Sequence, residues 1–219
     1  INELKEVDRL TTSCCPSFVM YIEKHFPKLA QYISHSPSPM VEAAMLIKRT
    51  SPDAKVVFIG PCSSKKHEYK LAKTKGAVDC VISFEELQAF LDARDIDVSA
   101  LPEHPLNNAS RFGRIFAKSG GICEGVQALT QNEDMGGKKI CPLALNGLEQ
   151  IKIAMLKMNA GRLPENFIEG MACEGGCLNG SLVLHHGDKN VKDVDRYGEE
   201  AKETDIGGSV ALYKMSLEG

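Results

Sequence analysis

The chain lacks tryptophan, and only 6% of its residues are aromatic. It also lacks an excess of charge of one sign, because 26 Lys and Arg oppose 29 Asp and Glu and the formal net charge is −3. A general basic field for nucleic acid is therefore absent, and no nucleic-acid partner is expected. No apolar run reaches the roughly 18 residues of a membrane span, so no membrane partner is expected either.

The N-terminal segment INELKEVDRL resembles neither a signal peptide nor a membrane anchor. The eight cysteines among 219 residues fall well below the roughly 8–10% of a disulfide scaffold. Both observations favour a reducing compartment, and we expect a cytoplasmic protein. In such a compartment, thiols serve as core residues, metal ligands or reactive groups. The length allows one large domain or two small lobes.

Apolar runs alternate with amphipathic segments along the chain, which predicts an α/β fold of parallel sheets with crossover helices. Ser83 and Glu86 have the spacing of a capping box, and Pro27 is a weak point in the first long helix. Strands are expected at residues 55–59, 77–82, 139–145 and 166–172, the first of them buried. Helices are expected at 17–33, 40–48, 64–73, 84–91, 148–158 and 191–202, and from the Gly120-Gly121 pair to residue 129.

Three segments carry the cysteines of interest: TSCCPSF at 12–18, GPCSSKKHE at 60–68 and MACEGGCLNG at 171–180. Two of them follow the carboxyl end of a predicted strand, where functional groups gather in parallel α/β folds. The first enters a predicted helix, whose free N–H groups stabilise anions. Gly175 and Gly176 allow a tight turn with exposed N–H donors.

Spacing alone leaves several interpretations of the thiols open. Four thiolates suit zinc or a [4Fe–4S] cluster equally well, and inert buried thiols are a further interpretation. Adjacent thiols point in different directions, so Cys14 is expected beside the site, available for proton chemistry. The metal candidates are Cys15, Cys62, Cys173 and Cys177, whereas Cys80, Cys123 and Cys141 are expected in the core and His67, His185 and His186 at the surface.

The three segments, in this order, resemble the signature motifs TSCCPxW, MPCxxKKxE and MACPGGCxxGG of [FeFe]-hydrogenases. Residues 116–121, FAKSGG, resemble the FGxTGG loop of the same family. The resemblance extends from Thr12 to Gly180 and implies a two-lobed hydrogenase-like domain. Residues 1–219 would be its C-terminal part, without the N-terminal portion of one lobe and the ferredoxin-like domains.

The resemblance also implies an H-cluster, a [4Fe–4S] cubane joined through a cysteine sulfur to a two-iron subcluster. Cys15, Cys62, Cys173 and Cys177 would hold the cubane, and Cys177 would bridge to the two-iron subcluster. Whether the fragment alone retains the cluster stays open.

The resemblance assigns roles to five further residues. Cys14 would pass protons, and Lys65 would donate a hydrogen bond to a cyanide ligand. Met171 and Phe116 would line the pocket of the two-iron subcluster. Ser34 would lie on a proton path that starts further upstream.

The chain departs from the family pattern at several positions. Gly60 replaces a usual Met, and Glu174 replaces a usual Pro and adds a charge near the cubane. These departures favour a divergent member, from a sensory branch, alongside a catalytic fragment that interconverts protons and H₂ with a ferredoxin-like electron partner. A hydrogenase-like iron–sulfur assembly protein and a four-thiolate zinc protein are further alternatives. Retention of Cys14, Lys65 and Met171 argues against the assembly protein.

Overall fold

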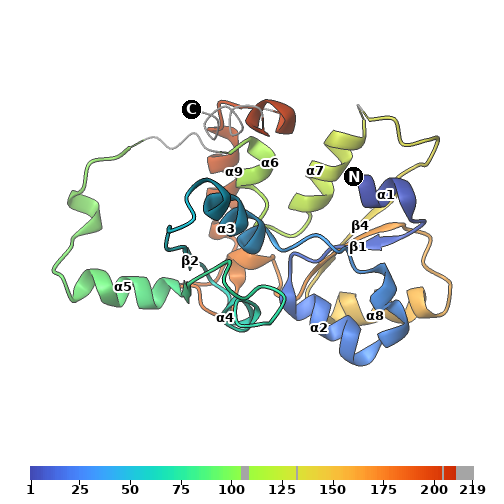
Figure 1. Ribbon diagram of the computed structural model, residues 1–219, viewed down its shortest axis with the longest axis horizontal. Helices are drawn as coiled ribbons and strands as arrows, with labels where there is room; N and C mark the ends of the chain where they lie inside the picture. The colour runs from blue at the N-terminus through green and yellow to red at the C-terminus, as the bar shows by residue number, and fades with distance from the viewer. Residues whose placement is uncertain (105–108, 132, 204, 211–219) are drawn as a thin grey trace.

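The computed structural model describes residues 1–219 except 105–108, 132, 204 and 211–219 (Figure 1). The chain forms two lobes, each built on its own parallel sheet. The large lobe has a three-stranded sheet in the order β1-β5-β4, with β1 at Leu10–Thr11, β4 at Pro142–Asn146 and β5 at Phe167–Met171. The small lobe has a two-stranded sheet of β2 (Val57–Ile59) and β3 (Cys80–Ile82). The predicted α/β fold is confirmed.

Strand β5 forms the centre of the large lobe, and all five of its residues are buried. Successive side chains of a strand point to opposite faces of its sheet. Ile168 accordingly packs in one apolar cluster, whereas Phe167 and Met171 pack in another. Central parallel strands are normally apolar throughout because both faces are covered. Glu169, in the middle of β5, departs from that rule.

Helices cover both faces of the large sheet. In Figure 1, α2 (Pro16–His25) and α8 (Leu148–Asn159) lie below the sheet, and α1 (Asn2–Glu6) and α7 (Gly121–Thr130) lie above it. The helix predicted at 17–33 ends at His25, because Phe26 leaves the helical region, with φ −136° and ψ 56°, ahead of Pro27. The 3₁₀ helix η1 (Pro27–Tyr32) then continues the chain. The helical spacing of Met155 and Met158 predicts core residues, and both are buried.

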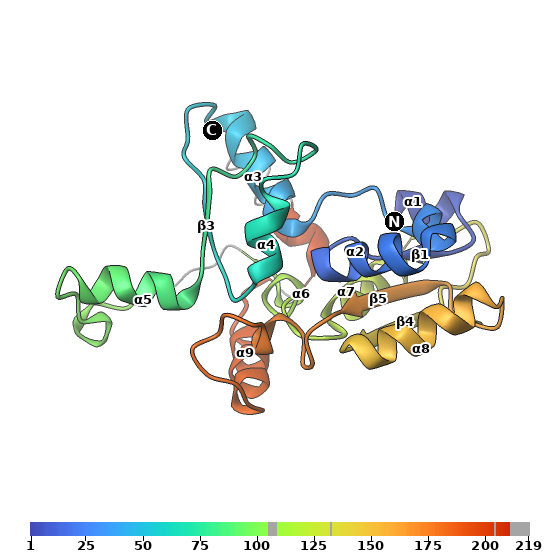
Figure 2. The ribbon, with the colours of Figure 1, turned by 90° about the horizontal axis from the view of Figure 1, so that it is seen from below.

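The small lobe is covered less completely. Its helices are α3 (Pro39–Thr50) and α4 (Ser63–Glu68), which lie beside the strands in Figure 2. The strand predicted at 55–59 is present as β2, but its predicted burial is wrong. Val57 is 51% and Ile59 41% exposed, because helices α3 and α4 cover only the opposite, Phe58 face of the sheet. The predicted helix at 64–73 ends at Glu68, where the hydroxyl of Thr74 donates to the Glu68 carbonyl at 2.5 Å and the chain turns.

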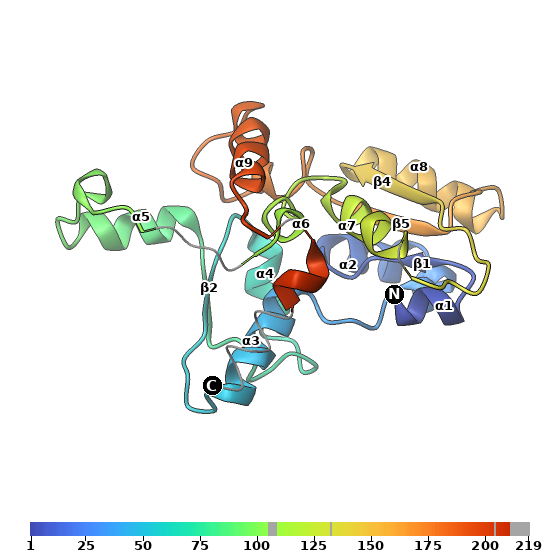
Figure 3. The same cartoon turned by 90° about the horizontal axis from the view of Figure 1, so that it is seen from above.

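An arm made of α5 (Phe84–Asp92) and η2 (Val98–Ala100) extends away from both lobes in all three views (Figures 1, 2 and 3). The predicted capping box begins α5. The Glu86 N–H donates to Ser83 Oγ at 3.1 Å, and the Ser83 N–H donates to Glu86 Oε2 at 2.7 Å. The two prolines within residues 94–108 predict a surface excursion there. Residues 94–104 are exposed, which confirms it up to that point, and residues 105–108 lie outside the described range.

Two further helices, α6 (Arg111–Arg114) and α9 (Lys189–Glu199), pack against each other beside the large lobe. Helix α6 contacts both α7 and α9, and it lies between them in Figure 3. The Arg114 guanidinium stacks 4.3 Å from the centre of the Tyr197 ring. The surface helix predicted at 191–202 is thus present, shifted by two to three residues. Within the described ranges, no helix combines the length and apolar character needed to cross a bilayer.

Candidate functional site

The three cysteine segments all follow the carboxyl ends of strands. Cys62 follows β2 and Cys173 follows β5, as predicted, and Cys14 and Cys15 follow β1. Strand β1 was missed because it has only two residues. Cys15 is the residue that precedes α2, and Cys62 the residue that precedes α4, so the N–H groups that begin each helix lie next to a thiol.

Direct contacts join the first two segments. The hydroxyls of Ser17 and Ser64 lie 2.5 Å apart, which links the beginning of α2 to the beginning of α4. The Lys65 ammonium donates to the carbonyl oxygen of Cys14 at 3.1 Å. These two contacts hold the Cys15 end of the large lobe against the Cys62 end of the small lobe.

The third segment closes on the second. The N–H of Leu182 donates to the carbonyl of Pro61 at 3.2 Å, and the hydroxyls of Ser63 and Ser181 lie 2.9 Å apart. Next to these contacts, a methyl group added at Gly180 would lie 2.2 Å from the Pro61 carbonyl oxygen. Only glycine allows this approach of the two backbones.

A cavity of about 580 Å³ opens where the three segments meet. That volume is typical of a site for a small molecule or cofactor. Six of the predicted site residues line it: Cys14, Cys62, Lys65, Phe116, Met171 and Cys177. The structure therefore brings together side chains separated by more than 150 positions in the sequence.

The four predicted cubane ligands act on one another electrostatically. Burial raises the pKa of the Cys177 thiol to about 12, and the neighbouring thiols of Cys15, Cys62 and Cys173 contribute in the same direction. Burial, followed by Cys15 and Cys62, likewise raises the pKa of Cys173. All eight cysteines of the chain are free. A bound cation or cluster would relieve the repulsion between four thiolates.

The arrangement of donors distinguishes two kinds of metal site. Among the residues with described positions, no three His, Cys, Asp or Glu side chains are close enough to hold one metal ion. A tetrahedral zinc site needs all its thiolates within about 2.3 Å of a single ion. A [4Fe–4S] cluster binds each thiolate through a different iron, so its ligands lie further apart. Cys15, Cys62, Cys173 and Cys177 belong to three separate segments, and four thiolates of this kind are the ligand type of a [4Fe–4S] cluster.

Lys65 supplies a buried cation at the cavity. Its ammonium lies 2.7 Å from Glu68 Oε2, and each side chain is only 9% exposed. A buried ammonium with this orientation can donate a charge-assisted hydrogen bond to an anionic ligand. The neighbouring Lys66 instead pairs with Glu86 at the surface. His67, like the other two histidines expected at the surface, is exposed.

Cys14 carries a buried thiol next to Thr12. Its sulfur lies 3.7 Å from Thr12 Oγ1. Burial raises the pKa of Cys14 to about 12, although the hydrogen bond with Thr12 acts to lower it. The charges of Cys15, Glu169 and Cys177 also act to raise it. Cys14 lines the cavity wall, which is where the resemblance places a proton carrier.

Ser34 lies away from the main cavity. It lines a second cavity of about 200 Å³, which Cys14 and Phe116 also line. The Ser34 hydroxyl donates to Glu3 Oε2 at 2.5 Å, and Glu3 Oε1 accepts from the His35 N–H at 2.8 Å. Burial acts to raise the pKa of Glu3, but these hydrogen bonds leave it below its usual value.

Two carboxylates near the site were not predicted from the sequence. Glu3 was missed, and with it the possibility that a proton path begins inside the described chain; the only signal was a carboxylate shortly before the first motif. Glu169 was missed as well, and its carboxylate lies buried within β5.

Of the three expected core thiols, Cys123 is buried, but Cys80 and Cys141 are only half-buried because they lie near the ends of strands β3 and β4.

Solved structures share this fold. An [FeFe]-hydrogenase from Chlamydomonas reinhardtii superposes with a TM-score of 0.65 at 22% sequence identity, over 93% of this chain and 70% of that one. Another [FeFe]-hydrogenase structure reaches a TM-score of 0.69 at 21% identity, over 98% of this chain and 73% of that one. At these identities the likeness establishes the fold alone.

Sequence comparison identifies relatives of two kinds. The family described as "Iron only hydrogenase large subunit, C-terminal domain" matches residues 1–181. The "Periplasmic [Fe] hydrogenase large subunit" of Nitratidesulfovibrio vulgaris is 27% identical over 212 residues, which cover 77% of this chain and 50% of that protein. "Iron hydrogenase 1" of Clostridium pasteurianum is 28% identical, covering 84% of this chain and 39% of that protein. The "Cytosolic iron-sulfur assembly component 3" of Bos taurus is also 28% identical, covering 95% and 55%. The chain thus spans about half the length of these relatives, or less.

Proposed function

The chain belongs to the family of C-terminal domains of iron-only hydrogenase large subunits, and from that premise we propose that it forms the H-cluster site of a hydrogenase. The reaction would be the reversible reduction of protons to H₂. One observation carries the proposal: Cys14, Lys65, Phe116, Met171 and Cys177 line a single cavity where the three cysteine segments meet. The family as a whole comprises hydrogenase-like iron–sulfur proteins.

The residues around the cavity fit the H-cluster in type and placement. Cys15, Cys62, Cys173 and Cys177 would hold the [4Fe–4S] part, and the cavity beside Cys177 would hold the two-iron subcluster. When bound, the cluster supplies the redox chemistry of 2H⁺ + 2e⁻ ⇌ H₂, and the protein contributes binding, orientation and proton transfer.

The protein's own groups have separable tasks in this proposal. The Lys65 ammonium, held by Glu68 at the cavity wall, would donate a hydrogen bond to an anionic ligand in the cavity. Met171 and Phe116 provide apolar walls that exclude water.

A proton route would leave the cavity through Cys14. The Cys14 thiol lies where the two cavities meet and would pass the proton between them. From there, the route would follow the second cavity to the Ser34 hydroxyl and the Glu3 carboxylate, which are already hydrogen-bonded.

We also propose that the chain works within a longer polypeptide that exchanges electrons with a ferredoxin-like partner. The N-terminal remainder would complete the H-cluster domain. The basis is the fraction of the relatives' length that the chain spans, which is 50% for the periplasmic hydrogenase and 39% for the clostridial one.

Two alternatives each rest on one observation. An assembly factor for iron–sulfur clusters is supported by relatives of that kind at similar identity. A sensory module, which binds the cluster but reports redox state or H₂, is supported by the exposed acidic Glu174 beside Cys173, where the hydrogenase motif has Pro. The assembly alternative predicts cysteine-bound clusters without CO or CN⁻ ligands. The sensory alternative predicts those ligands without rapid turnover.

The test uses the full-length protein, matured anaerobically together with the hydrogenase maturation enzymes. We expect infrared bands of CO and CN⁻, the EPR signals of a [4Fe–4S] cluster, and H₂ evolution. Cys62→Ser should lower the iron and sulfide content, whereas Cys80→Ser, a matched thiol outside the site, should not. Wild-type protein that shows cubane signals without CO and CN⁻ bands would overturn the hydrogenase proposal in favour of the assembly alternative.

A further inference from the structure

Glu169 is a charged side chain at the centre of an apolar strand. It is 0% exposed and lies on the face of β5 that Phe167 and Met171 also occupy. Burial of an unpaired carboxylate is strongly unfavourable, so such groups persist only where they are fully hydrogen-bonded. The partners of Glu169 therefore indicate what the carboxylate does.

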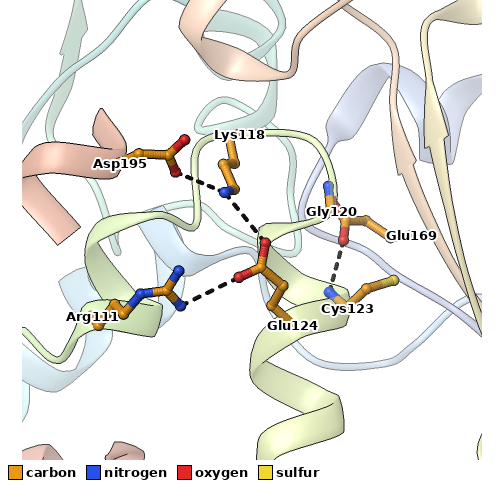
Figure 4. A network of polar contacts seen from close by, with 7 residues as sticks. All are labelled: Arg111, Lys118, Gly120, Cys123, Glu124, Glu169 and Asp195. Atoms are coloured by element: carbon orange, nitrogen blue, oxygen red, sulfur yellow. Dashed lines mark hydrogen bonds and ion pairs between the residues drawn. The ribbon is translucent and has the colours of Figure 1, made fainter. Parts of the chain in front are cut away.

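The carboxylate binds the beginning of helix α7. Oε1 accepts from the Gly120 N–H at 2.8 Å, and Oε2 accepts from the Cys123 N–H at 2.8 Å (Figure 4). Burial raises the pKa of Glu169, while the N–H donors of Cys123 and Gly120 act to lower it. An acidic group is stabilised at a helix N-terminus by free N–H donors and the helix dipole.

Gly120 ends the loop that forms one wall of the cavity. This loop, residues 116–120, begins with Phe116 at the cavity. Its next residue, Ala117, accepts the N–H of Cys177 at 2.8 Å, and the Ser119 N–H donates to the Gly175 carbonyl at 3.4 Å. Loop 116–120 therefore forms backbone hydrogen bonds with the third cysteine segment, residues 171–180. At Gly120 it is also fixed to strand β5 by the Glu169 carboxylate.

Loop 116–120 packs closely against the backbone of the third cysteine segment at Gly176. A methyl group added at Gly176 would lie 2.5 Å from the Ser119 nitrogen and 2.6 Å from the Ala117 oxygen. A displacement of the loop must therefore move the cysteine segment as well, since closely packed backbones transmit shifts.

A second carboxylate binds the same region from its outer side and serves as a comparison. Glu124 lies 3.3 Å from both Arg111 and Lys118, and Lys118 also pairs with Asp195 at 2.7 Å (Figure 4). The Glu124 side chain is 38% exposed. Exposed ion pairs of this kind contribute little to stability.

We propose that Glu169 is a positioning residue, which fixes loop 116–120 and through it places Cys177 and Phe116 at the cavity. Glu169 does not line the cavity itself, so its action passes through the loop. The importance of Cys177 rests on the proposed function. The positioning is a property of the polypeptide and exists without a cluster.

The test compares Glu169→Gln with Glu124→Gln in full-length, cluster-free protein. The introduced side-chain amide directs an NH₂ group toward one of the two N–H donors, so one hydrogen bond is lost. We expect alkylation of Cys177 by iodoacetamide, followed by mass spectrometry, to accelerate about tenfold, which corresponds to one lost buried hydrogen bond. Amide hydrogen exchange at Ser119 and Cys177 should accelerate in parallel. Glu124→Gln should change neither, and Cys80 should react at the wild-type rate in both variants.

Three results would overturn the proposal. The first is an unchanged alkylation rate at Cys177 in Glu169→Gln. The second is equal acceleration at Cys80 and Cys177, and the third is loss of the fold; either would make Glu169 a residue of the whole fold rather than of the loop. Glu169→Asp, which keeps the charge but shortens the side chain, should react at an intermediate rate. Faster alkylation in Glu169→Gln, together with wild-type protein that never acquires CO and CN⁻ bands, would overturn only the proposed function.

Discussion

In the large lobe, a strand buried on both faces leads to Cys173, whereas in the small lobe a strand with two exposed side chains leads to Cys62. Both strands belong to parallel sheets, and both present their cysteine at the carboxyl end. Topology therefore places the thiols in the same way in the two lobes. What differs is the packing behind each thiol, and with it the expected resistance of each lobe to substitution.

The interactions behind the two cysteines differ in kind. Behind Cys173, Phe18, Ile168 and Met155 form an apolar cluster without solvent contact. Behind Cys62, helix α4 carries the buried ion pair of Lys65 and Glu68, and the same ammonium donates to the Cys14 carbonyl of the large lobe. Apolar packing depends on volume and tolerates no cavity, whereas a buried ion pair depends on both partners being present.

The largest effect is expected in the large lobe. Phe18→Ala removes a fully buried ring and should lower the free energy of unfolding by about 3–5 kcal/mol. Val57→Ala, at a 51% exposed position of the small lobe, should change it by less than about 0.5 kcal/mol. Urea denaturation of both variants measures the difference. Equal losses of free energy of unfolding in the two variants would show that β2 is covered in solution. The packing of the two lobes would then not differ in the way described.

The next effect tests the ion pair of the small lobe. Glu68→Leu leaves the Lys65 ammonium buried without its carboxylate, and we expect a loss of about 3 kcal/mol. The double variant Lys65→Met/Glu68→Leu should recover most of that loss, because no charge is then left unpaired. Denaturation of cluster-free protein separates this stability effect from any effect on the cavity. A double variant no more stable than Glu68→Leu would contradict the account.

A smaller effect is expected in the arm. Ser83→Ala removes the side-chain acceptor that begins α5 and should weaken that helix by about 1 kcal/mol. Because the arm extends away from both lobes, the change should appear as faster hydrogen exchange of the α5 amides, with the β5 amides unaffected. Asp97→Ala, which removes the cap of η2, is the matched control and should leave the α5 amides unchanged. Faster exchange throughout the protein would show that the arm packs on the lobes.

The smallest expected effect is on the stability of the fold at low pH. The pKa of Glu3 is lowered in the folded protein, so its carboxylate contributes stability above its unfolded pKa. This contribution should disappear as the pH falls through the folded pKa. Glu3→Gln should therefore reduce the loss of stability on acidification, whereas Glu6→Gln, exposed on the same helix, should not. Identical acid titrations of the two variants, followed by circular dichroism, would contradict the assigned role of the Ser34 and His35 hydrogen bonds.

Much of the fold was predictable because its signals are local. The alternation of apolar runs and amphipathic segments predicted β2 to β5 and the main helices to within a few residues, except where Pro27 and Thr74 ended helices early. The burial of β2 was not predictable, because it depends on which helices cover the sheet. Strand β1 was missed because two residues give too short a pattern.

The site was predictable for a different reason. Its cysteines lie within motifs, so a resemblance identifies them even though they are far apart in the sequence. Glu3 and Glu169 lie outside any such pattern, and their partners are 31 and 46 to 49 positions away. The apolar strand pattern around Glu169 is a local signal that its carboxylate is buried, but nothing local identifies its partners, because they are brought to it only when the tertiary structure forms.

The contact of Gly180 with Pro61 has a consequence for the evolution of the chain. The backbone of Gly180, with φ −61° and ψ 163°, is one that any amino acid adopts, so conformation does not restrict this position. The restriction comes from the 2.2 Å that would separate an added methyl group from the Pro61 oxygen. A saturation library at this codon should therefore return glycine alone wherever the cysteine loops of the two lobes must meet. The absence of a side chain at Gly180 therefore allows those loops to approach this closely.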